Sequence, residues 1–256
     1  MIKSRFFYRV KYFLLQGFVL VTLSFALNSC SKTDPLDCFK ATGDDITENR
    51  NSGDFNKIIL RDNVNLIITQ DTINKITVTA GDKIIDKVIT RISDGALNIE
   101  NNNTCNWVRS FDREIIVNVT VKELTQIEYR GSGDINSSNI IKSDSLVLNV
   151  WEGAGKVDLE IDVHRNYIYF HIGTADIFYK GNTHLSYITA ASFGPVDAIE
   201  LNNVFTYISN EGSNNCYVNT NLHLGATITS IGNIYYKGDP EISLNDTGEG
   251  ALIKMD

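Results

Sequence analysis

Gly131-Ser-Gly-Asp-Ile135 is the phrase that decides the fold, because close variants of it return along the chain. The variants are Gly153-Ala-Gly-Lys-Val157, Gly173-Thr-Ala-Asp-Ile177, Gly194-Pro-Val-Asp-Ala198, Gly212-Ser-Asn-Asn-Cys216 and Ile231-Gly-Asn-Ile-Tyr235. When Asp134, Lys156, Asp176, Asp197, Asn215 and Asn233 are taken as equivalent, the copies lie 18 to 22 residues apart. A repeat of this length predicts one supersecondary unit per period. Such units stack, because one unit alone cannot bury its apolar face.

The pattern around these phrases is that of short strands. Residues 64–69 and 115–121 alternate apolar and polar side chains, and Ser145–Val150 is followed, after a glycine corner, by Lys156–Ile161. Glycine allows a sharp turn without a Cβ penalty. We therefore predict an all-β protein, a right-handed parallel β-helix-like stack with about 20 residues per coil. A β-sandwich is the alternative fold, but its loops vary more than this steady period allows.

The first 29 residues read as an export signal. Four basic residues precede the apolar run of residues 13–27, which is too short for a membrane-spanning helix of roughly 20 residues. The run ends in Leu27-Asn28-Ser29-Cys30, which resembles a bacterial lipobox. We therefore expect Cys30 to be lipidated and to anchor the protein to a membrane. The alternative is an ordinary secretory signal followed by an incidental cysteine.

Residues 30–52 are polar and predict a flexible tether, which leaves residues 53–256 as a single domain. Residues 1–29 hold four of the 23 basic residues and no acidic one, so the remainder carries 19 basic against 31 acidic residues, a net charge of −12. Such a chain repels nucleic acid and anionic lipid headgroups. We therefore expect no nucleic-acid partner.

The remaining cysteines do not predict a metal centre, because the chain contains no Cys-x-x-Cys pair. Cys216 takes a repeat position that Ile135, Val157, Ile177, Ala198 and Ile234 hold in the other copies, so we expect it to be a small buried hydrophobe. A disulfide between Cys38 and Cys105 stays open. We expect no cofactor and no metal.

Three phrases together resemble the family described as putative auto-transporter adhesin, head GIN domain. They are Phe55-Asn-Lys-Ile-Ile-Leu-Arg-Asp-Asn-Val-Asn-Leu-Ile-Ile-Thr-Gln70, Tyr129-Arg-Gly-Ser-Gly-Asp-Ile135 and Gly232-Asn-Ile-Tyr-Tyr-Lys-Gly-Asp-Pro240. The resemblance covers most of residues 53–241. It implies a β-helical fold and exposure at the cell surface, and it brings no catalytic residues with it.

A polysaccharide-active β-helix enzyme, a lyase or a hydrolase, is the rival hypothesis. Its chemistry would need clustered carboxylates, for which the candidates are Asp134, Asp158, Asp176 and Asp197. Three of them share one repeat position, which favours a role at the turns. The four histidines lack a short metal-binding spacing. We therefore predict no catalytic residues and no enzymatic activity.

Tyrosines crowd the repeats and carry the binding hypothesis. On an outer sheet face they would offer a large contact area with a polar tip to a glycan or a surface protein. The alternative is that many point inward and fill the core. The candidates for ligand binding are Tyr169, Tyr179, Tyr187, Tyr207 and Tyr236.

The sequence as a whole predicts a lipid-anchored protein of the cell envelope. We expect it at the outer membrane, exposed at the surface, with an adhesin-like or scaffold role through a repetitive β-face.

Overall fold

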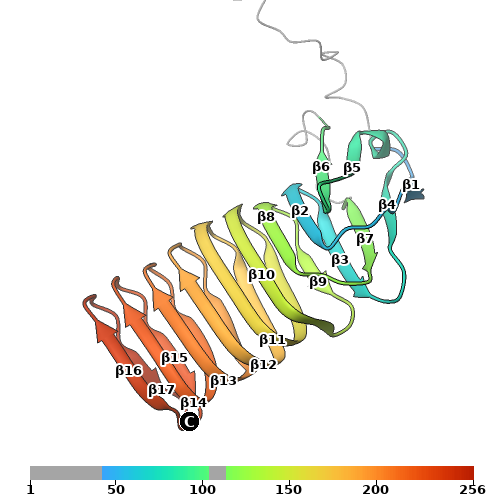
Figure 1. Ribbon diagram of the computed structural model, residues 1–256. Coiled ribbons are helices and arrows are strands. Elements are labelled where there is room, and N and C mark those ends of the chain that lie inside the picture. Colours follow the sequence, from blue (N-terminus) through green and yellow to red (C-terminus); the bar gives the residue numbers. More distant parts are fainter. Residues whose placement is uncertain (1–41, 104–113) are drawn as a thin grey trace, which may run out of the picture.

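The computed structural model describes residues 42–103 and 114–256, and it contains a β-solenoid of about six turns (Figure 1). The coils lie side by side along one axis, with the N-terminal strands at one end and the C-terminus at the other. Parallel pairs about 20 residues apart confirm the predicted repeat stack. They exclude the β-sandwich, whose sheets would be antiparallel. The strands of the stack are β2 (Lys57–Asp62), β3 (Asn65–Gln70), β8 (Gln126–Gly131), β9 (Ile135–Ser137), β10 (Ile141–Gly153), β11 (Lys156–Gly173), β12 (Asp176–Ala190), β13 (Val196–Asn210), β14 (Cys216–Ile228), β15 (Ile234–Lys237), β16 (Glu241–Asp246) and β17 (Leu252–Lys254).

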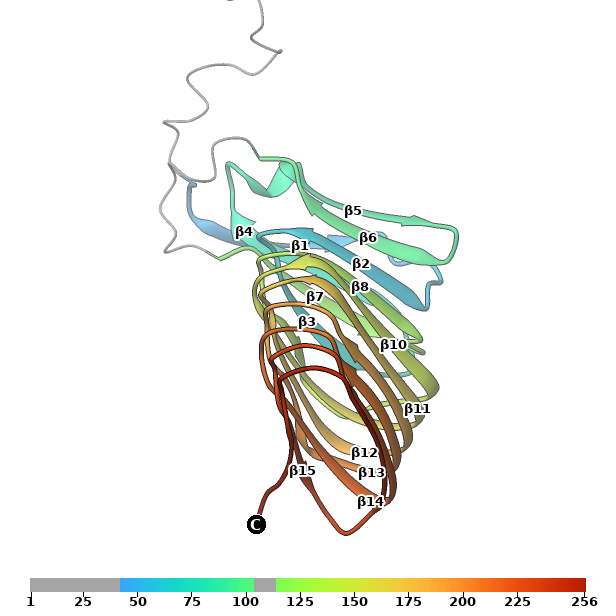
Figure 2. The ribbon, with the colours of Figure 1, turned by 90° about the vertical axis from the view of Figure 1, so that its left-hand side faces the viewer.

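Each of β11 to β14 bends once and so contributes to both sides of the stack (Figure 2). In β12, Asp176–Lys180 pairs on one side and Leu185–Ala190 on the other, and both halves continue into the same neighbours. Side chains inside the bend are polar and buried, among them Thr183 and Asn203, which share one register. No glycine marks this bend in β11 or β13, which explains why the sequence did not reveal it.

The corners between successive coils need glycine for a reason other than turn geometry. A Cβ at Gly194 would lie 1.9 Å from the carbonyl oxygen of Ala175 in the coil below, and one at Gly212 would lie 2.1 Å from that of Ser192. Neither glycine has a positive φ. The requirement therefore comes from the close approach of two backbones.

Asparagine and aspartate side chains at the corners join one coil to the next. Each accepts a hydrogen bond from the backbone N–H at the equivalent position of the following coil, rather than from its own turn. The bonds run from Asp134 N–H to Asn65 Oδ1 (2.8 Å), from Lys156 N–H to Asp134 Oδ1 (2.8 Å), from Asn233 N–H to Asn215 Oδ1 (3.0 Å) and from Ala251 N–H to Asn233 Oδ1 (2.8 Å).

One copy of the predicted repeat was aligned wrongly. The strand register places Val196, not Ala198, level with Ile177 and Cys216. The residue before it is Pro195, so Asp197 does not belong to the row of corner residues. Its strand begins directly after the Gly-Pro corner, two residues earlier than the aspartate had suggested.

Tyr129 links two neighbouring coils in the first part of the stack. Its buried hydroxyl donates a hydrogen bond to the carbonyl oxygen of Gly133 and accepts one from the N–H of Gly155 in the next coil, both at 2.7 Å. Burial raises the pKa of Tyr129 to about 12, although the backbone hydrogen bonds oppose the shift. The phrase Tyr129–Ile135 is thus a device that holds neighbouring coils in register.

Five further strands close the N-terminal end. They are β1 (Asp45–Arg50), β4 (Lys75–Gly81), β5 (Val88–Ser93), β6 (Ala96–Asn101) and β7 (Ile116–Val121), with the short 3-10 helix η2 (Ile85–Lys87) between β4 and β5. β6 and β7 pair parallel with β2 and β3 of the stack, whereas β1 with β4, β4 with β7 and β5 with β6 are antiparallel pairs. The predicted tether was therefore wrong for Asp45–Arg50, whose backbone pairs with β4 although its sequence has little apolar periodicity.

Several sequence predictions fall outside the described residues. They are the signal at residues 1–29, the lipidation of Cys30, and the disulfide between Cys38 and Cys105. Cys216 is described, and it is a buried free thiol whose pKa burial raises to about 12.

We expect Gly194→Ala to destabilise the protein by about 1–3 kcal/mol, because the added methyl group must displace the backbone of the coil below. Gly53→Ala is the matched control, since its Cβ would meet only Ile92 Cδ1 at 3.5 Å. It should stay within about 0.5 kcal/mol of the parent. Urea unfolding followed by circular dichroism measures both. Equal stabilities would show that the corner backbones are not in contact.

Cys216→Asp should destabilise the protein by more than about 4 kcal/mol, because it buries a charge among apolar residues. Cys216→Ala should cost only about 1 kcal/mol. Thermal unfolding by differential scanning fluorimetry compares the two variants. An Asp variant that melts with the parent would contradict the inward placement of this side chain.

Candidate ligand-binding face

The second halves of the bent strands form one flat sheet whose outer face carries regular rows of side chains. In one row Tyr167, Tyr187 and Tyr207 occupy the same register and are followed by Gly225 and Ser243. Parallel neighbours in a sheet are about 4.8 Å apart, which matches the stacking distance of aromatic rings. The ring centroids are 5.6 Å apart for Tyr167–Tyr187 and 5.1 Å for Tyr187–Tyr207. The 20-residue period thus builds a tyrosine ladder.

The ladder belongs to a longer chain of ring contacts, which we call the aromatic stripe. At one end Trp151 stacks on His171 at 3.8 Å, and His171 lies 6.2 Å from Tyr169. At the other end Tyr207 lies 5.7 Å from His223. Tyr187 and Tyr207 are 39% and 40% exposed, so a ligand can reach their rings. The stripe consists of Trp151, His171, Tyr169, Tyr167, Tyr187, Tyr207 and His223.

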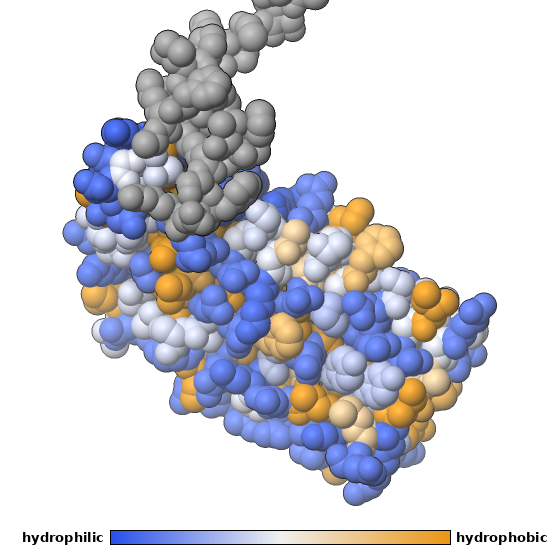
Figure 3. Space-filling view, turned by 180° about the vertical axis from the view of Figure 1, so that it is seen from behind, coloured by the Kyte–Doolittle hydropathy of each residue, from blue (hydrophilic) through white to orange (hydrophobic). Residues whose placement is uncertain are grey.

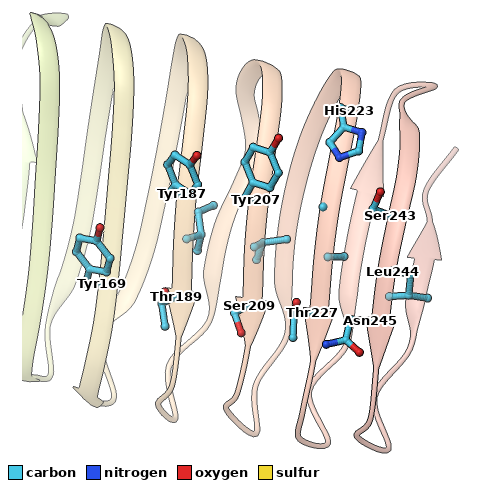
Figure 4. Close-up of a pocket in the computed structure, with 14 residues that line it drawn as sticks. Tyr169, Tyr187, Thr189, Tyr207, Ser209, His223, Thr227, Ser243, Leu244 and Asn245 are labelled. Atoms are coloured by element: carbon cyan, nitrogen blue, oxygen red, sulfur yellow. The ribbon is translucent and has the colours of Figure 1, made fainter.

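A second row beside the ladder supplies hydrogen-bonding groups. Tyr169 is followed in register by Thr189, Ser209, Thr227 and Asn245, which we call the hydroxyl row. Figure 4 shows these polar side chains beside Tyr187, Tyr207 and His223 along the outer face of the strands. The face therefore offers aromatic surfaces along one line and hydroxyl and amide groups along the next.

A shallow hollow of about 780 Å³ opens where the tyrosine ladder ends. Gly225 takes the place of the next ring, and a Cβ there would lie 2.7 Å from Cδ1 of Tyr207. Glycine at this position lets the Tyr207 ring lie over the backbone and leaves the space beyond it free. None of the described residues that line the hollow is Asp, Glu, Lys or Arg. The hollow is therefore suited to an uncharged polar ligand.

The five tyrosines predicted to bind a ligand do not all lie on the outer face. Tyr169, Tyr187 and Tyr207 lie together on this face and line the hollow. Tyr179 and Tyr236 are only 2% and 9% exposed, because they occupy inward positions of their strands. The prediction that these two tyrosines belong to a surface binding site was wrong. Burial also raises the pKa of Tyr179, whose hydroxyl has no hydrogen-bond partner among the described residues.

Sequence reasoning missed the rest of the face. The hydroxyl row, Gly225 and the pairing of Trp151 with His171 were not nominated. Once Ile168, Ile188 and Ile208 are recognised as inward, the residues on either side of each must face outward. The alternation is present in the sequence, but it assigns side chains to the two faces only when each bent strand is taken as one continuous unit.

The first halves of the strands form the other outer surface, which carries more charge. There Lys156 Nζ lies 2.7 Å from an Asp158 carboxylate oxygen and 4.9 Å from the centre of the Phe178 ring. Tyr217 and Tyr235 stack at 5.0 Å on this surface. Seen from behind the view of Figure 1, the molecule is a mosaic of hydrophilic residues with scattered apolar ones (Figure 3).

The four aspartates considered for catalysis do not share one site. Asp134 is a corner residue bonded to the next coil, and Asp176 lies at an equivalent corner. Asp158 and Asp197 line a smaller hollow of about 190 Å³ together with Lys180 and Glu200. Asp158 pairs with Lys156, and Asp197 accepts the N–H of Ile199 at 3.1 Å. Within residues 42–103 and 114–256, no group of three or more His, Cys, Asp or Glu could hold a metal ion.

Solved structures with the same fold include proteins from Bacteroides and Parabacteroides species. A putative adhesin from Bacteroides fragilis is 21% identical, with a TM-score of 0.76 over 83% of this chain and 97% of its own. A putative adhesin from Parabacteroides merdae is 18% identical, with a TM-score of 0.59 over 84% and 98%. A putative lipid binding protein from Parabacteroides distasonis is 19% identical, with a TM-score of 0.62 over 84% and 98%. At these identities the likeness shows the fold alone.

No curated protein matches the chain. A family model does match, over residues 54–240, a range that contains the corner phrases, the tyrosine ladder and the hydroxyl row up to Thr227. The chain therefore belongs to the family described as putative auto-transporter adhesin, head GIN domain.

Proposed function

We propose that this protein is a cell-envelope lipoprotein with a non-catalytic, adhesin-like role, and that it binds a neutral glycan through the aromatic stripe and the hydroxyl row beside it. The observation that carries the proposal is the hollow at the end of the tyrosine ladder, which combines exposed rings with uncharged hydrogen-bonding groups. Sugar rings present apolar C–H faces that pack on aromatic side chains, and their hydroxyls need such partners.

Membership of an adhesin family implies a place at the cell surface. The family alone does not choose between a glycan and a protein as the ligand. The charge of the chain favours a neutral glycan over an acidic one, because a net charge of −8 repels acidic polysaccharides. A neutral polysaccharide is not repelled in this way. An extended polysaccharide could follow the aromatic stripe and the hydroxyl row across several coils. A surface protein remains the other outcome of the binding test.

A polysaccharide-active enzyme is the second candidate function, and one observation favours it. Asp158, Asp197 and Glu200 line the smaller hollow with Lys180. Glycoside hydrolysis needs one carboxyl group that protonates the leaving oxygen and a second that acts as base or nucleophile. Here Asp158 is held by Lys156, and Asp197 accepts a backbone N–H. These partners give both carboxylates structural roles, so binding is the function that the geometry supports better.

Tyr187→Ala combined with Tyr207→Ala should weaken binding to a neutral polysaccharide about tenfold or more, because tyrosine is enriched among the binding residues whose truncation costs about 2 kcal/mol or more. Affinity electrophoresis in gels that contain soluble xylan or hydroxyethyl cellulose measures the retardation, with polygalacturonate as the acidic comparison. The matched control is Tyr217→Ala with Tyr235→Ala, which removes a similar stacked pair from the other surface.

The control pair should bind like the parent and lose comparable thermal stability. Two results would contradict a neutral-glycan site on the aromatic stripe. One is that polygalacturonate alone retains the parent, and the other is that the two double variants lose affinity for the neutral polysaccharide equally. Binding only to surface proteins would replace the glycan by a protein ligand. Release of reducing ends that Asp197→Asn abolishes would replace binding by catalysis.

Lipidation at Cys30 should account for membrane association. No helix in the described part of the chain is long and apolar enough to span a membrane. We expect a clickable fatty acid to label the parent and not Cys30→Ser, and the parent alone to partition into detergent. Label that persists in Cys30→Ser, or that is absent from the parent, would remove the lipoprotein assignment while leaving the binding face untouched.

A further inference from the structure

The last coil of the stack exposes side chains that are buried in every coil before it. Ile242 and Leu244 are level with Leu224 and Ala226, which are 0% and 2% exposed. In the last coil the same inward positions are 41% and 48% exposed. All six residues of β16 are exposed. None of the described residues covers Ile242 and Leu244 at this end of the stack.

The same end leaves two strand edges without partners in the described chain. β16 bonds to β14 along one edge, and β17 bonds to β15. An unpaired edge presents a row of N–H and C=O groups that can pair with another strand. At the opposite end the outermost strands are β1 and β5, which pair antiparallel with β4 and β6. A head-to-tail contact between copies would therefore join β16 to a strand that runs against the coils, and it would not continue the parallel stack.

The sequence of β16 complements itself in one antiparallel register. With Ser243 opposite Ser243 of a second copy, Ile242 faces the second copy's Leu244, and Glu241 faces the second copy's Asn245. At the inward positions Ile242 and Leu244 then meet their counterparts, the inward Asp246 faces the second copy's Pro240, and no two carboxylates are opposed. This arrangement also keeps the interior face of both strands on the same side, as the pleat requires.

Other registers are worse. A slip of one residue would put the inward Ile242 opposite the outward Asn245 and Glu241 opposite Asp246, which joins like charges and mixes the two faces. A slip of two residues places either Leu244 opposite Pro240 or Ile242 opposite Asp246. The acidic residues and Pro240 at the two ends of β16 therefore disfavour these slipped registers.

We propose that this protein forms a twofold dimer through its C-terminal coil, with β16 paired antiparallel to β16 of a second copy across Ser243. The interface is isologous, as in most homodimers. It covers Ile242 and Leu244 and pairs the free edge of β16. Because the N-terminal strands lie at the other end of each stack (Figure 1), the two N-terminal ends point away from each other.

Sedimentation equilibrium of the chain from residue 31 onward tests the proposal. The parent should approach twice the monomer mass as its concentration rises, and Leu244→Lys should stay monomeric over the same range. Leu244 is 48% exposed, so lysine there buries no charge in the monomer and should leave the melting temperature nearly unchanged. The matched control is Phe193→Lys, at a 63% exposed residue in the corner between β12 and β13, which should dimerise like the parent.

Cross-linking tests the register. Opposed residues of an antiparallel pair have Cα atoms about 4.5–5.5 Å apart, within the range that a disulfide spans. In a background with Cys38→Ser and Cys105→Ser, Ser243→Cys should oxidise to a covalent dimer, and Asn245→Cys should do so much less. A parent that is monomeric at all concentrations, a Leu244→Lys variant that still dimerises, or preferential cross-linking at position 245 would each overturn the proposal.

Discussion

The close approach of backbones at the corners of the stack is the constraint on which the structure depends. Each coil follows the path of the one below it, so the corner residue must leave room for a carbonyl oxygen directly beneath, as Gly194 does for Ala175. Side-chain amides and carboxylates then join the coils, and the Tyr129 hydroxyl bridges Gly133 and Gly155. These contacts hold the register of the stack, because a slip of one residue would break them all.

Because the register is fixed, equivalent residues of successive coils form continuous rows on the outer surface. Since Tyr167, Tyr187 and Tyr207 are 20 residues apart and the coils are in register, their rings form a ladder instead of a scatter. Ending that ladder at Gly225 creates a hollow bounded by rings and hydroxyls. The same regularity has a consequence at the last coil, where the inward positions of β16 find no cover in the described chain. The proposed ligand face and the proposed dimer interface therefore meet at β16, because Ser243, Leu244 and Asn245 also line the hollow.

Much of the fold could be predicted from the sequence, because glycine corners and alternating apolar residues are local signals. The copies of the repeat were aligned incorrectly at Gly194-Pro195, because Asp197, two residues after the proline, resembles the corner aspartates of the other copies. The bend within each strand was missed because buried Thr183 and Asn203, rather than glycine, mark it. The site was predicted in part: Tyr169, Tyr187 and Tyr207 face outward, whereas Tyr179 and Tyr236 face inward. Whether a tyrosine faces out depends on the parity of its strand position, which fragmentary strand predictions could not fix.

If ligands bind the outer face formed by the second halves of the strands, its backbone amides should be protected in the complex. Hydrogen–deuterium exchange, measured by mass spectrometry with and without the neutral polysaccharide that retards the protein, detects this protection. We expect slower exchange in peptides covering residues 185–190 and 205–210, and no change around Asp158 and Asp197. Protection confined to the smaller hollow beside Asp197 and Glu200, with none along the tyrosine ladder, would contradict it.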